Sequence, residues 1–504
     1  MDKLIPFFVA IPIGSAFIIY LIGSIFKSKA NRFTDVFSMI VVSANLVLTA
    51  FTLIAVKNNS MILSYMGSWR PPIGITLVVD GLSVFMLIII NFIGLMAVLF
   101  SINYMEQYTS KYKYYALLML LIGGMNGIVI TGDLFNMFVF IEISAIASYV
   151  LVSFGIGEHE LEAAFKYMVL AEVGSLMVLL SIALIYAATG TLNMADIAQT
   201  LSNNPKPTLL TFLSILLIVG FSIKAALVPF HAWLPDAHPS APAPISSMLS
   251  GVVIKILGIY AMVRIFYNVL GMSNVVQTIL LVLAGLSMLV GVILQLGQTD
   301  IKRLLAYCSI SQIGYVLLGF GLGTPLGIFA GLFHLANHAV FKSLLFFDSG
   351  AIEYETHTRD ITKMGGLSSK MPITSTSWFI GTFAASGIPP FNGFWSKLIL
   401  IIAAVQAQYY ILAGIAGISA ILTLASFIKV QRQAFLGPLP AMLAKIKEVP
   451  ALMILTLLIL SALCLLMGLM LIPQLRTPIL DLAQKAVLVG SDYARIVFTR
   501  AGLQ

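Results

Sequence analysis

The stretch GFSIKAALVPFHAWLPDAHPSAPAPISSMLSGVVIKILGIY, residues 220–260, decides the fold. It is apolar and of membrane length, yet Lys224 precedes a proline-rich interruption and Lys255 follows it. A lysine near the centre of a bilayer costs about 2.5–3.5 kcal/mol on insertion scales, so two of them beside an interruption are hard to explain as packing. Irregular backbone at membrane depth is tolerated only where it is buried in protein or lines a watery cavity. The stretch therefore predicts a broken membrane helix on an ion path.

The composition of the whole chain is that of a polytopic membrane protein. Of its 504 residues, 60% are hydrophobic and 10% are charged, and the mean hydropathy is +1.02. Soluble domains carry about 25% charged residues. The net charge of +8 is typical of basic cytoplasmic loops and requires no nucleic-acid partner. Cys308 and Cys464 both fall in apolar stretches, so no disulfide framework is indicated.

We expect an all-α polytopic bundle of about fourteen membrane-spanning helices, since each span needs about 20 apolar residues. The N-terminal apolar run is too long for a signal peptide, so we assign it as the first span. Residues 75–80, ITLVVD, form a candidate short strand, and residues 476–504 suit an interfacial or docking helix. The expected spans are residues 4–26, 34–56, 81–104, 113–131, 133–154, 163–188, 208–228, 243–268, 275–296, 302–321, 326–348, 372–405 (interrupted), 409–434 and 450–472.

The basic residues of the loops predict how the chain lies in the cell membrane. Loops after odd-numbered spans hold fifteen of them, whereas the opposite side, with Arg264 counted there, holds five outside the C-terminal tail. Because basic loops face the cytoplasm, this distribution places both termini outside. Four lysines remain inside spans. The acids inside spans are Glu142 and Glu172, with Asp133 and Asp348 near span ends.

Two of the expected spans are interrupted in a similar way. The first break follows Val228, at PFHAW, and the second lies within AASGIPPFNGFWSK, residues 384–397; each places Pro-Phe ahead of a Trp beside one lysine. Paired interrupted helices indicate an inverted-repeat transporter with a midplane site, although two unrelated proline kinks would look similar. We predict two inverted five-helix repeats, each with one broken helix. The expected divisions are 1–112 (helices 1–3), 113–270 (helices 4–8), 271–435 (helices 9–13) and 436–504 (helix 14 and the tail).

Four separated motifs carry a family likeness. LAYCSISQIGYVLLGFG (305–321), KAALVPFHAWLPDAHPSAPAPISSML (224–249), HLANHAVFKSLLFFDSG (334–350) and GIPPFNGFWSK (387–397) resemble the antiporter-like subunits of respiratory complex I and their relatives. Within that family, GDLFNMFVFIEISAIASY (132–149) is most similar to the D-type subunit of Mrp-type sodium/proton antiporters. It is similar also to the antiporter-like subunit of membrane-bound hydrogenases and sulfur-reducing complexes.

The resemblance implies a fourteen-helix fold with two inverted repeats and a chain of buried charges. At the positions that match the family pattern stand Glu142, Lys224, Lys255, His338 with Lys342, and Lys397. The lysine on the twelfth helix fits the pattern of the D-type Mrp subunit. The sequence departs from the family at residues 348–350, DSG, where a small apolar residue often precedes the glycine.

His334, His338 and Lys342 recur every four residues and therefore share one face of a helix. The spacing His-x-x-x-His can bind zinc, but no further ligand is close in sequence and the lysine repels a cation, so we predict no metal site. Histidine titrates near neutral pH, which suits a proton relay. Hydrogen-bonded packing is the alternative for this face.

Three polar residues in or after the first break, His231, Asp236 and His238, are a candidate proton entrance. Helix capping and loop hydration explain them equally well. Glu172, in the sixth span, is left without an assigned role.

The sequence predicts a proton-translocating, antiporter-like subunit whose partners are other membrane subunits of an Mrp-type antiporter or a respiratory complex such as a membrane-bound hydrogenase. Protons, or else sodium ions, would cross the bilayer.

No nucleotide-binding loop, Cys-x-x-Cys cluster or nucleophile elbow is present, so we expect neither a cofactor nor a catalytic centre in this chain. The energy for transport would come from an ion gradient or from redox partner subunits. A stand-alone transporter of a small solute and a structural subunit without transport are the alternatives. The predicted proton path is Glu142, Lys224, Lys255, His334, His338, Lys342 and Lys397.

Overall fold

The computed structural model describes residues 1–69, 73–490 and 492–502, and nearly all of these residues are helical. The helices of the first half are α1 (Phe7–Phe26), α2 (Asn31–Asn59), α3 (Gly81–Tyr104), α4 (Lys111–Ile130), α5 (Leu134–Val152), α6 (Glu158–Thr189), α7 (Met194–Asn203), α8 (Pro207–Lys224), α9 (Leu234–Ser240), α10 (Ala243–Met248) and α11 (Ala261–Val263). Those of the second half are α12 (Asn274–Leu296), α13 (Ile301–Gly321), α14 (Pro325–Thr356), α15 (Pro372–Ser386), α16 (Asn392–Gln406), α17 (Tyr410–Val430), α18 (Ala451–Leu466), α19 (Pro473–Arg476), α20 (Leu482–Leu488) and α21 (Asp492–Ala501).

Twelve stretches of the described chain are long and apolar enough to cross a membrane. One of them, residues 2–59, contains both α1 and α2, whereas α15 and α16 are each too short to qualify alone. The all-helical membrane fold is therefore confirmed. The count of fourteen and the inverted repeats stay predictions.

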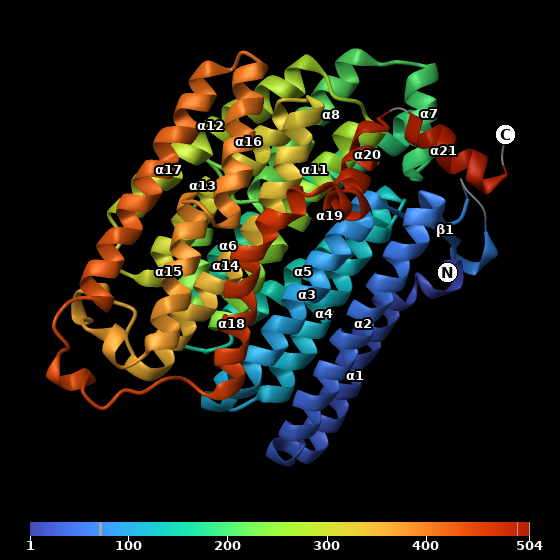
Figure 1. Ribbon diagram of the computed structural model, residues 1–504. Coiled ribbons are helices and arrows are strands. Elements are labelled where there is room, and N and C mark those ends of the chain that lie inside the picture. Colours follow the sequence, from blue (N-terminus) through green and yellow to red (C-terminus); the bar gives the residue numbers. More distant parts are fainter. Residues whose placement is uncertain (70–72, 491, 503–504) are drawn as a thin grey trace.

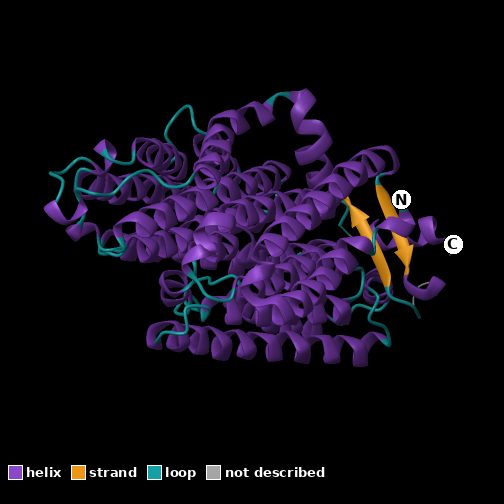
Figure 2. Cartoon of the chain, turned by 90° about the horizontal axis from the view of Figure 1, so that it is seen from below, coloured by secondary structure: helices purple, strands orange, loops and turns teal. Residues whose placement is uncertain are grey.

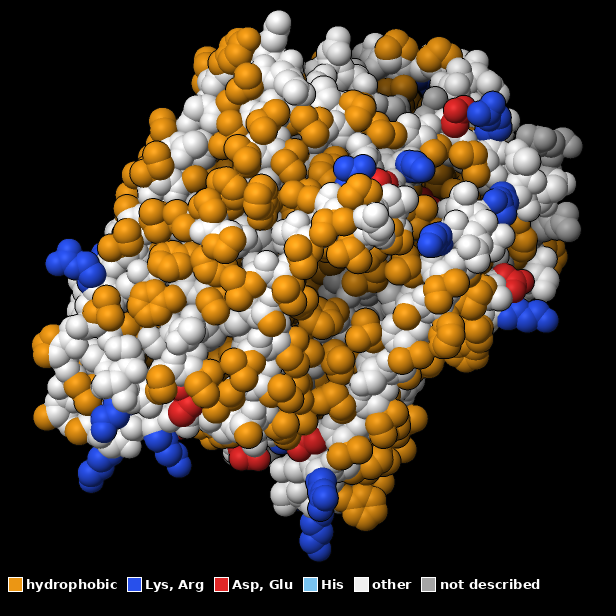
Figure 3. All heavy atoms as spheres, in the orientation of Figure 1, with side chains coloured by type: hydrophobic (Ala, Val, Ile, Leu, Met, Phe, Trp, Pro, Cys, Tyr) orange, Lys and Arg blue, Asp and Glu red, His pale blue; other side chains and the backbone are white. Residues whose placement is uncertain are grey.

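The long helices pack side by side in one bundle, with α1 and α2 along one flank and α12 and α17 along the other (Figure 1). Apolar side chains cover most of the face seen in Figure 3, and the basic side chains gather toward the helix ends and near the C-terminal segments. This distribution is what a bilayer requires, because lysine and arginine reach water only near the ends of a span.

Acidic side chains begin several of the helices. Asp80, Asp133 and Asp300 each accept a hydrogen bond from a backbone N–H of the first turn of α3, α5 and α13 respectively. Such caps satisfy amide groups that have no partner within the helix. Asp133, which the sequence places near a span end, thus has a structural explanation.

Two short strands, β1 (Met61–Tyr65) and β2 (Thr76–Asp80), pair antiparallel between α2 and α3. Strand β2 matches the strand expected at residues 75–80, whereas β1 is not foreseen. Residues 70–72 of the connecting segment lie outside the described residues. The strands lie at one end of the molecule, beside both ends of the described chain (Figure 2).

The C-terminal segment docks onto the bundle. Helix α20 packs against α3 and α21 packs against α7, and the side chains of Leu480, Val487 and Val497 are buried. Of the two predictions for residues 476–504, the docking helix is the one that these contacts support.

Candidate functional site

The first cluster of the predicted path lies where α5, α6 and α8 meet. The Lys224 Nζ atom lies 2.7 Å from Ser175 Oγ and 3.4 Å from Glu142 Oε1. The Ser175 hydroxyl in turn donates a hydrogen bond of 2.6 Å to Glu142 Oε1. An amine, a hydroxyl and a carboxylate are thus in direct contact, and a serine that both accepts and donates can pass a proton between the other two groups.

The helix break after Lys224 is held by specific hydrogen bonds. The Trp233 indole donates to the Ile223 carbonyl oxygen at 2.9 Å, and Val228 N donates to Ser287 Oγ at 3.0 Å. Backbone groups freed by the break therefore find partners inside the protein, as its depth in the membrane demands. The expected span 208–228 is four residues too long, because the backbone leaves the helix at Ala226, which has a φ of 54°.

Glu172, which has no role assigned from the sequence, lies on the outer side of this first cluster. Its Oε1 accepts a hydrogen bond of 3.5 Å from the Tyr149 hydroxyl, and its carboxylate interacts electrostatically with Glu142 and Lys224. The side chain is only partly buried. Glu172 therefore places a second carboxylate beside the first cluster.

Lys255 lies in a π-helical part of the stretch from Ala243 to Val269 and is fully buried. Its ammonium group donates to the carbonyl oxygens of Ser250, at 3.0 Å, and Gly251. No carboxylate of the described residues forms an ion pair with it. The widened π-helical turns thus supply the acceptors that an acid supplies for Lys224.

A close approach between two backbones joins Lys224 to the helix that carries Lys255. A Cβ atom on Gly258 would overlap the Cβ of Ala225, the residue after Lys224. Only glycine fits there. This contact fixes the end of α8 against the π-helical turns that carry Lys255.

The second cluster is built on α14. His334 Nδ1 lies 2.9 Å from Ser396 Oγ of α16, and Lys342 Nζ donates to the Leu305 carbonyl oxygen at 3.0 Å. The His338 ring lies between them with its centroid 6.4 Å from that of His334, and neither of its ring nitrogens has a hydrogen bond to a described residue. All three side chains are fully buried. One helix therefore presents two imidazoles and an amine within about two turns.

Lys397 of α16 completes the second cluster. Its ammonium donates to the Ala385 carbonyl oxygen of α15 at 2.7 Å, across the second break, and lies 4.6 Å from the centroid of the Tyr315 ring. His338 interacts electrostatically with Lys255, Lys342 and Lys397. The second cluster is thus gathered around His338. We call the titratable residues of the two clusters, together with Lys255, the central row, which consists of Glu142, Lys224, Lys255, His334, His338, Lys342 and Lys397.

The three residues of the candidate entrance do not lie in one place. Asp236 forms ion pairs with Lys166 at 3.1 Å and Arg303 at 3.5 Å, and it lines a charged surface pocket of about 290 Å³. His238 is fully buried, stacks on Phe346 and interacts electrostatically with Lys342. His231 is only half-buried. Asp236 therefore faces water, whereas His238 lies near the central row.

An ion-pair network that the sequence does not predict joins the first residues of α13 to the end of α14 and the loop after it. Lys302 Nζ lies 2.6 Å from Glu353, and Arg359 contacts both Glu353, at 3.4 Å, and Asp300, at 3.0 Å. Burial alone would lower the pKa of Arg359, but Asp300 and Glu353 raise it above its ordinary value. Lys302, one of the fifteen basic residues counted on the cytoplasmic side, is buried, and its ammonium also donates to the Ala241 carbonyl oxygen.

The assignment of Arg264 to the outer loops is wrong. Its guanidinium is buried and binds both oxygens of Asp80, at 2.7 and 2.8 Å, before the start of α3. It also lies 5.7 Å from the centroid of the Tyr493 ring of α21. The pair joins a strand, a membrane helix and the docked tail, and the sequence carries no local signal for a partner so distant along the chain.

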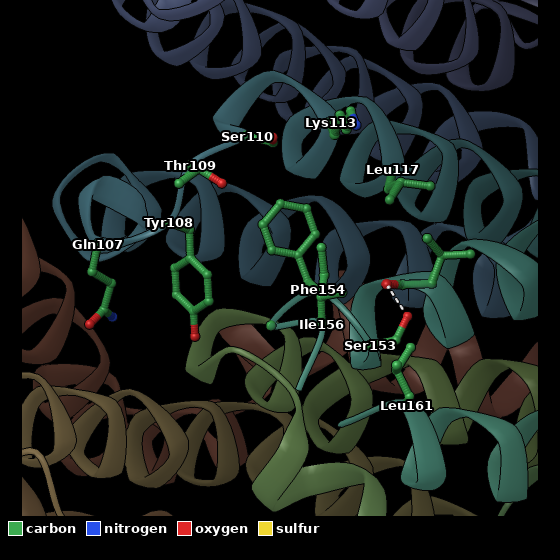
Figure 4. A pocket seen from close by; sticks show the side chains of 12 residues that line it. Gln107, Tyr108, Thr109, Ser110, Lys113, Leu117, Ser153, Phe154, Ile156 and Leu161 are labelled. Atoms are coloured by element: carbon green, nitrogen blue, oxygen red, sulfur yellow. Dashed lines mark hydrogen bonds between the residues drawn. The ribbon is translucent and has the colours of Figure 1, made fainter. Parts of the chain in front are cut away.

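A pocket of about 570 Å³ lies away from the central row. Tyr108, Lys113 and Phe154 line it near the ends of α3, α4 and α5, and Figure 4 shows their side chains around it. No residue of the central row lines it. Among the described residues there is also no group of three or more His, Cys, Asp or Glu able to hold a metal ion.

Comparison with known families matches most of the chain. Residues 131–423 match the family described as NADH:quinone oxidoreductase/Mrp antiporter, TM, and residues 67–115 match NADH-ubiquinone oxidoreductase (complex I), chain 5 N-terminus.

Individual relatives agree with this match. The chain is 35% identical to the D-type Na(+)/H(+) antiporter subunit of Alkalihalophilus pseudofirmus, over 83% of this chain and 85% of that one. It is also 35% identical to the N-type NADH-quinone oxidoreductase subunit of Desulforudis audaxviator, over 75% and 76%.

Two solved structures share the fold over nearly the whole length. A chain of the Mrp complex from a Dietzia species has a TM-score of 0.89 at 29% identity, covering 100% of this chain and 99% of that one. A chain of the membrane-bound sulfane sulfur reductase, an archaeal respiratory membrane complex, has a TM-score of 0.88 at 32% identity, covering 98% and 99%.

Proposed function

The chain is an antiporter-like membrane subunit of the NADH:quinone oxidoreductase/Mrp antiporter family, and from this premise we propose that it moves protons along the central row. It would work with other membrane subunits, either in an Mrp-type antiporter or in a related respiratory complex. The energy would come from an ion gradient or from redox chemistry in those partners. Protons are the favoured cargo because all members of the row except Glu142 are titratable amines and imidazoles rather than the oxygen ligands that bind hard cations.

One observation carries the proposal: the second cluster and Lys255 bury three lysines and two histidines with no carboxylate of the described residues paired to the lysines. Lys255, Lys342 and Lys397 instead donate to backbone carbonyl oxygens. Ionisable side chains in the interior of a membrane protein are costly and usually mark ion pathways or proton relays. His338, which has no hydrogen bond to a described residue, interacts electrostatically with all three lysines, and it would relay protons among them.

The first cluster would act as the switch. While Glu142 and Ser175 contact Lys224, the ammonium form is stabilised by a charge-assisted hydrogen bond. If α5 or α6 moves the carboxylate away, a buried ammonium loses its partner and tends to release its proton. The released proton would pass toward Lys255, and water rather than the apolar contact between Ala225 and Gly258 would have to carry it.

The experiment that tests the proposal is Glu142→Gln in the intact complex, reconstituted into liposomes. We expect proton flux driven by an imposed gradient to be lost, because glutamine keeps the shape of the side chain but no longer charges or discharges. Glu158→Gln, an exposed residue at the start of α6, is the matched control and should retain flux. Full flux in an assembled Glu142→Gln complex would instead favour a structural subunit.

Transport of a small solute is less well supported. A solute needs a polar cavity, and the described pockets of about 570 and 290 Å³ lie at the ends of the helices rather than along the central row. Uptake of labelled solutes that depends on the central row would speak for this alternative.

A further inference from the structure

Asp348 is a buried acid that the central row does not include. It lies on α14, where α14, α15 and α18 pack side by side (Figure 1), and none of its surface is exposed. Its Oδ1 atom contacts the hydroxyl of Ser377 on α15, whereas its Oδ2 atom has no hydrogen-bond partner among the described residues. A buried acid with one unbonded oxygen destabilises the folded protein. Inside a membrane protein, such a group is therefore a candidate functional residue.

The surroundings of Asp348 provide no positive charge. Ser377 faces it from α15, Cys464 from α18, and Glu448 from the loop before α18. No lysine, arginine or histidine of the described residues forms an ion pair with it. A buried carboxylate without a cation is strongly disfavoured, so the neutral, protonated form is the one that this junction accommodates.

The hydroxyl of Ser377 can adapt to either protonation state of Asp348. The Ser377 hydroxyl lies in hydrogen-bond range of both Asp348 Oδ1 and the Thr374 carbonyl oxygen, the latter at 3.0 Å, but it has a single hydrogen to donate. If Asp348 carries a proton, it donates to Ser377, which donates to Thr374, and both contacts become hydrogen bonds. If the proton leaves, the hydroxyl turns to Asp348. The same heavy-atom positions therefore serve a loaded and an unloaded state.

A path toward the surface begins at the first turn of α15. Glu448, which is only partly buried, accepts hydrogen bonds from Ile373 N at 2.9 Å and from the Thr374 hydroxyl at 2.5 Å. Thr374 is also the residue whose carbonyl faces Ser377. Thr374 thus lies between a carboxylate near the surface, which its hydroxyl contacts, and the Ser377–Asp348 pair, which its carbonyl oxygen contacts.

In the other direction, α15 leads to the central row. Its last turn carries Ala385, whose carbonyl binds Lys397, and Ser377 and Ala385 are separated by about 12 Å along the helix axis. The seam between is closed, since a Cβ on Gly381 would lie 2.9 Å from Leu345 Cδ2. A proton could cross only after α15 shifts against α14.

We propose that Asp348 and Ser377 form a further proton-binding site, loaded from the side of Glu448 and discharging toward Lys397. The proton arrives from water, binds a carboxylate oxygen of Asp348 and leaves for the unprotonated amine of Lys397. Discharge into the central row rests on the proposed function. Binding of the proton does not.

Infrared difference spectroscopy of the purified complex tests the binding step. Asp348→Asn should remove one carbonyl band of a protonated carboxylic acid, and Ser377→Ala should shift that band without removing it. Asp360→Asn, a partly exposed acid in the loop after α14, should leave the band unchanged. A spectrum that Asp348→Asn does not alter would overturn the proposal.

Proton flux in liposomes tests the discharge step. We expect Asp348→Asn to lower the flux several-fold, with the complex still assembled. A lost band with unchanged flux would overturn the discharge toward Lys397. This failure differs from that of the proposed function, in which the Glu142→Gln complex itself would keep its flux.

Discussion

The buried lysines of the central row differ in what holds their ammonium groups. Lys224 is bound by a hydroxyl and a carboxylate, which favour its charged form. Lys255, Lys342 and Lys397 are bound by neutral carbonyl oxygens. A neutral amine still donates to a carbonyl, so these three keep a hydrogen bond in either protonation state. This difference suits Lys224 to gating and the other three to relay.

Ser175 should be essential to the switch at Lys224. Ser175→Ala removes the hydroxyl that bridges Lys224 and Glu142, and we expect gradient-driven proton flux to fall several-fold. Ser181→Ala is the control, because the Ser181 hydroxyl bonds to Met177 of its own helix. Equal flux in both variants, measured with a pH-sensitive dye inside liposomes, would remove Ser175 from the path.

The buried pair of Arg264 and Asp80 should matter for stability. Arg264→Met leaves the Asp80 carboxylate buried and unpaired, which costs about 3–5 kcal/mol. We expect a clear fall in the thermal unfolding midpoint of the purified complex. Lys363→Met, at an exposed pair with Asp360 3.9 Å apart, should change it little. Similar midpoints for the two variants would contradict a structural role for the Arg264 pair.

At the scale of elements, the path depends on helices that are not regular. The break after α8, the π-helical turns around Lys255 and the break between α15 and α16 all expose carbonyl oxygens inside the membrane. Trp233 satisfies one such carbonyl, and lysines of the row satisfy others. Irregular backbone thus creates the acceptors that let the lysines stay buried.

The contact between the end of α8 and the π-helical turns should not tolerate a side chain. Gly258→Ala places a methyl group against Ala225, and such overpacking typically costs about 1–3 kcal/mol. Gly414→Ala on α17 is the matched control, because nothing lies within 4 Å of its added carbon, and better helix propensity should leave it at least as stable. A thermal unfolding midpoint that is lower for Gly414→Ala than for Gly258→Ala would contradict the close approach of Gly258 to Ala225.

Hydropathy and proline positions predict the elements well but not their contacts. The apolar runs place nearly all long helices, and Pro229 and Pro390 mark both breaks. The π-helical turns at Lys255 have no sequence signal, because they depend on packing against α8 and α14. Burial of Arg264 and the pairing of Ser175 with Lys224 depend on partners far along the chain. A one-dimensional pattern carries no such information.

At the scale of the whole molecule, one bundle separates two kinds of charge. Ion pairs such as Lys302–Glu353 and Arg303–Asp236 lie toward the helix ends, whereas the amines and imidazoles of the second cluster lie in the interior on neutral partners. The apolar face seen in Figure 3 is suited to contact with lipid or with other membrane subunits. A proton that enters this interior meets relay groups rather than fixed ion pairs, and this is the central claim of the account.

Proton flux through the reconstituted complex carrying Lys255→Met tests that claim most directly. Methionine fills a similar volume but cannot bind a proton. Because no acid of the described residues pairs with Lys255, the substitution leaves no carboxylate of these residues without its partner. We predict that the assembled complex loses gradient-driven flux, whereas Lys445→Met, an exposed lysine in the loop before α18, keeps it. Undiminished flux in the Lys255→Met complex would contradict the account.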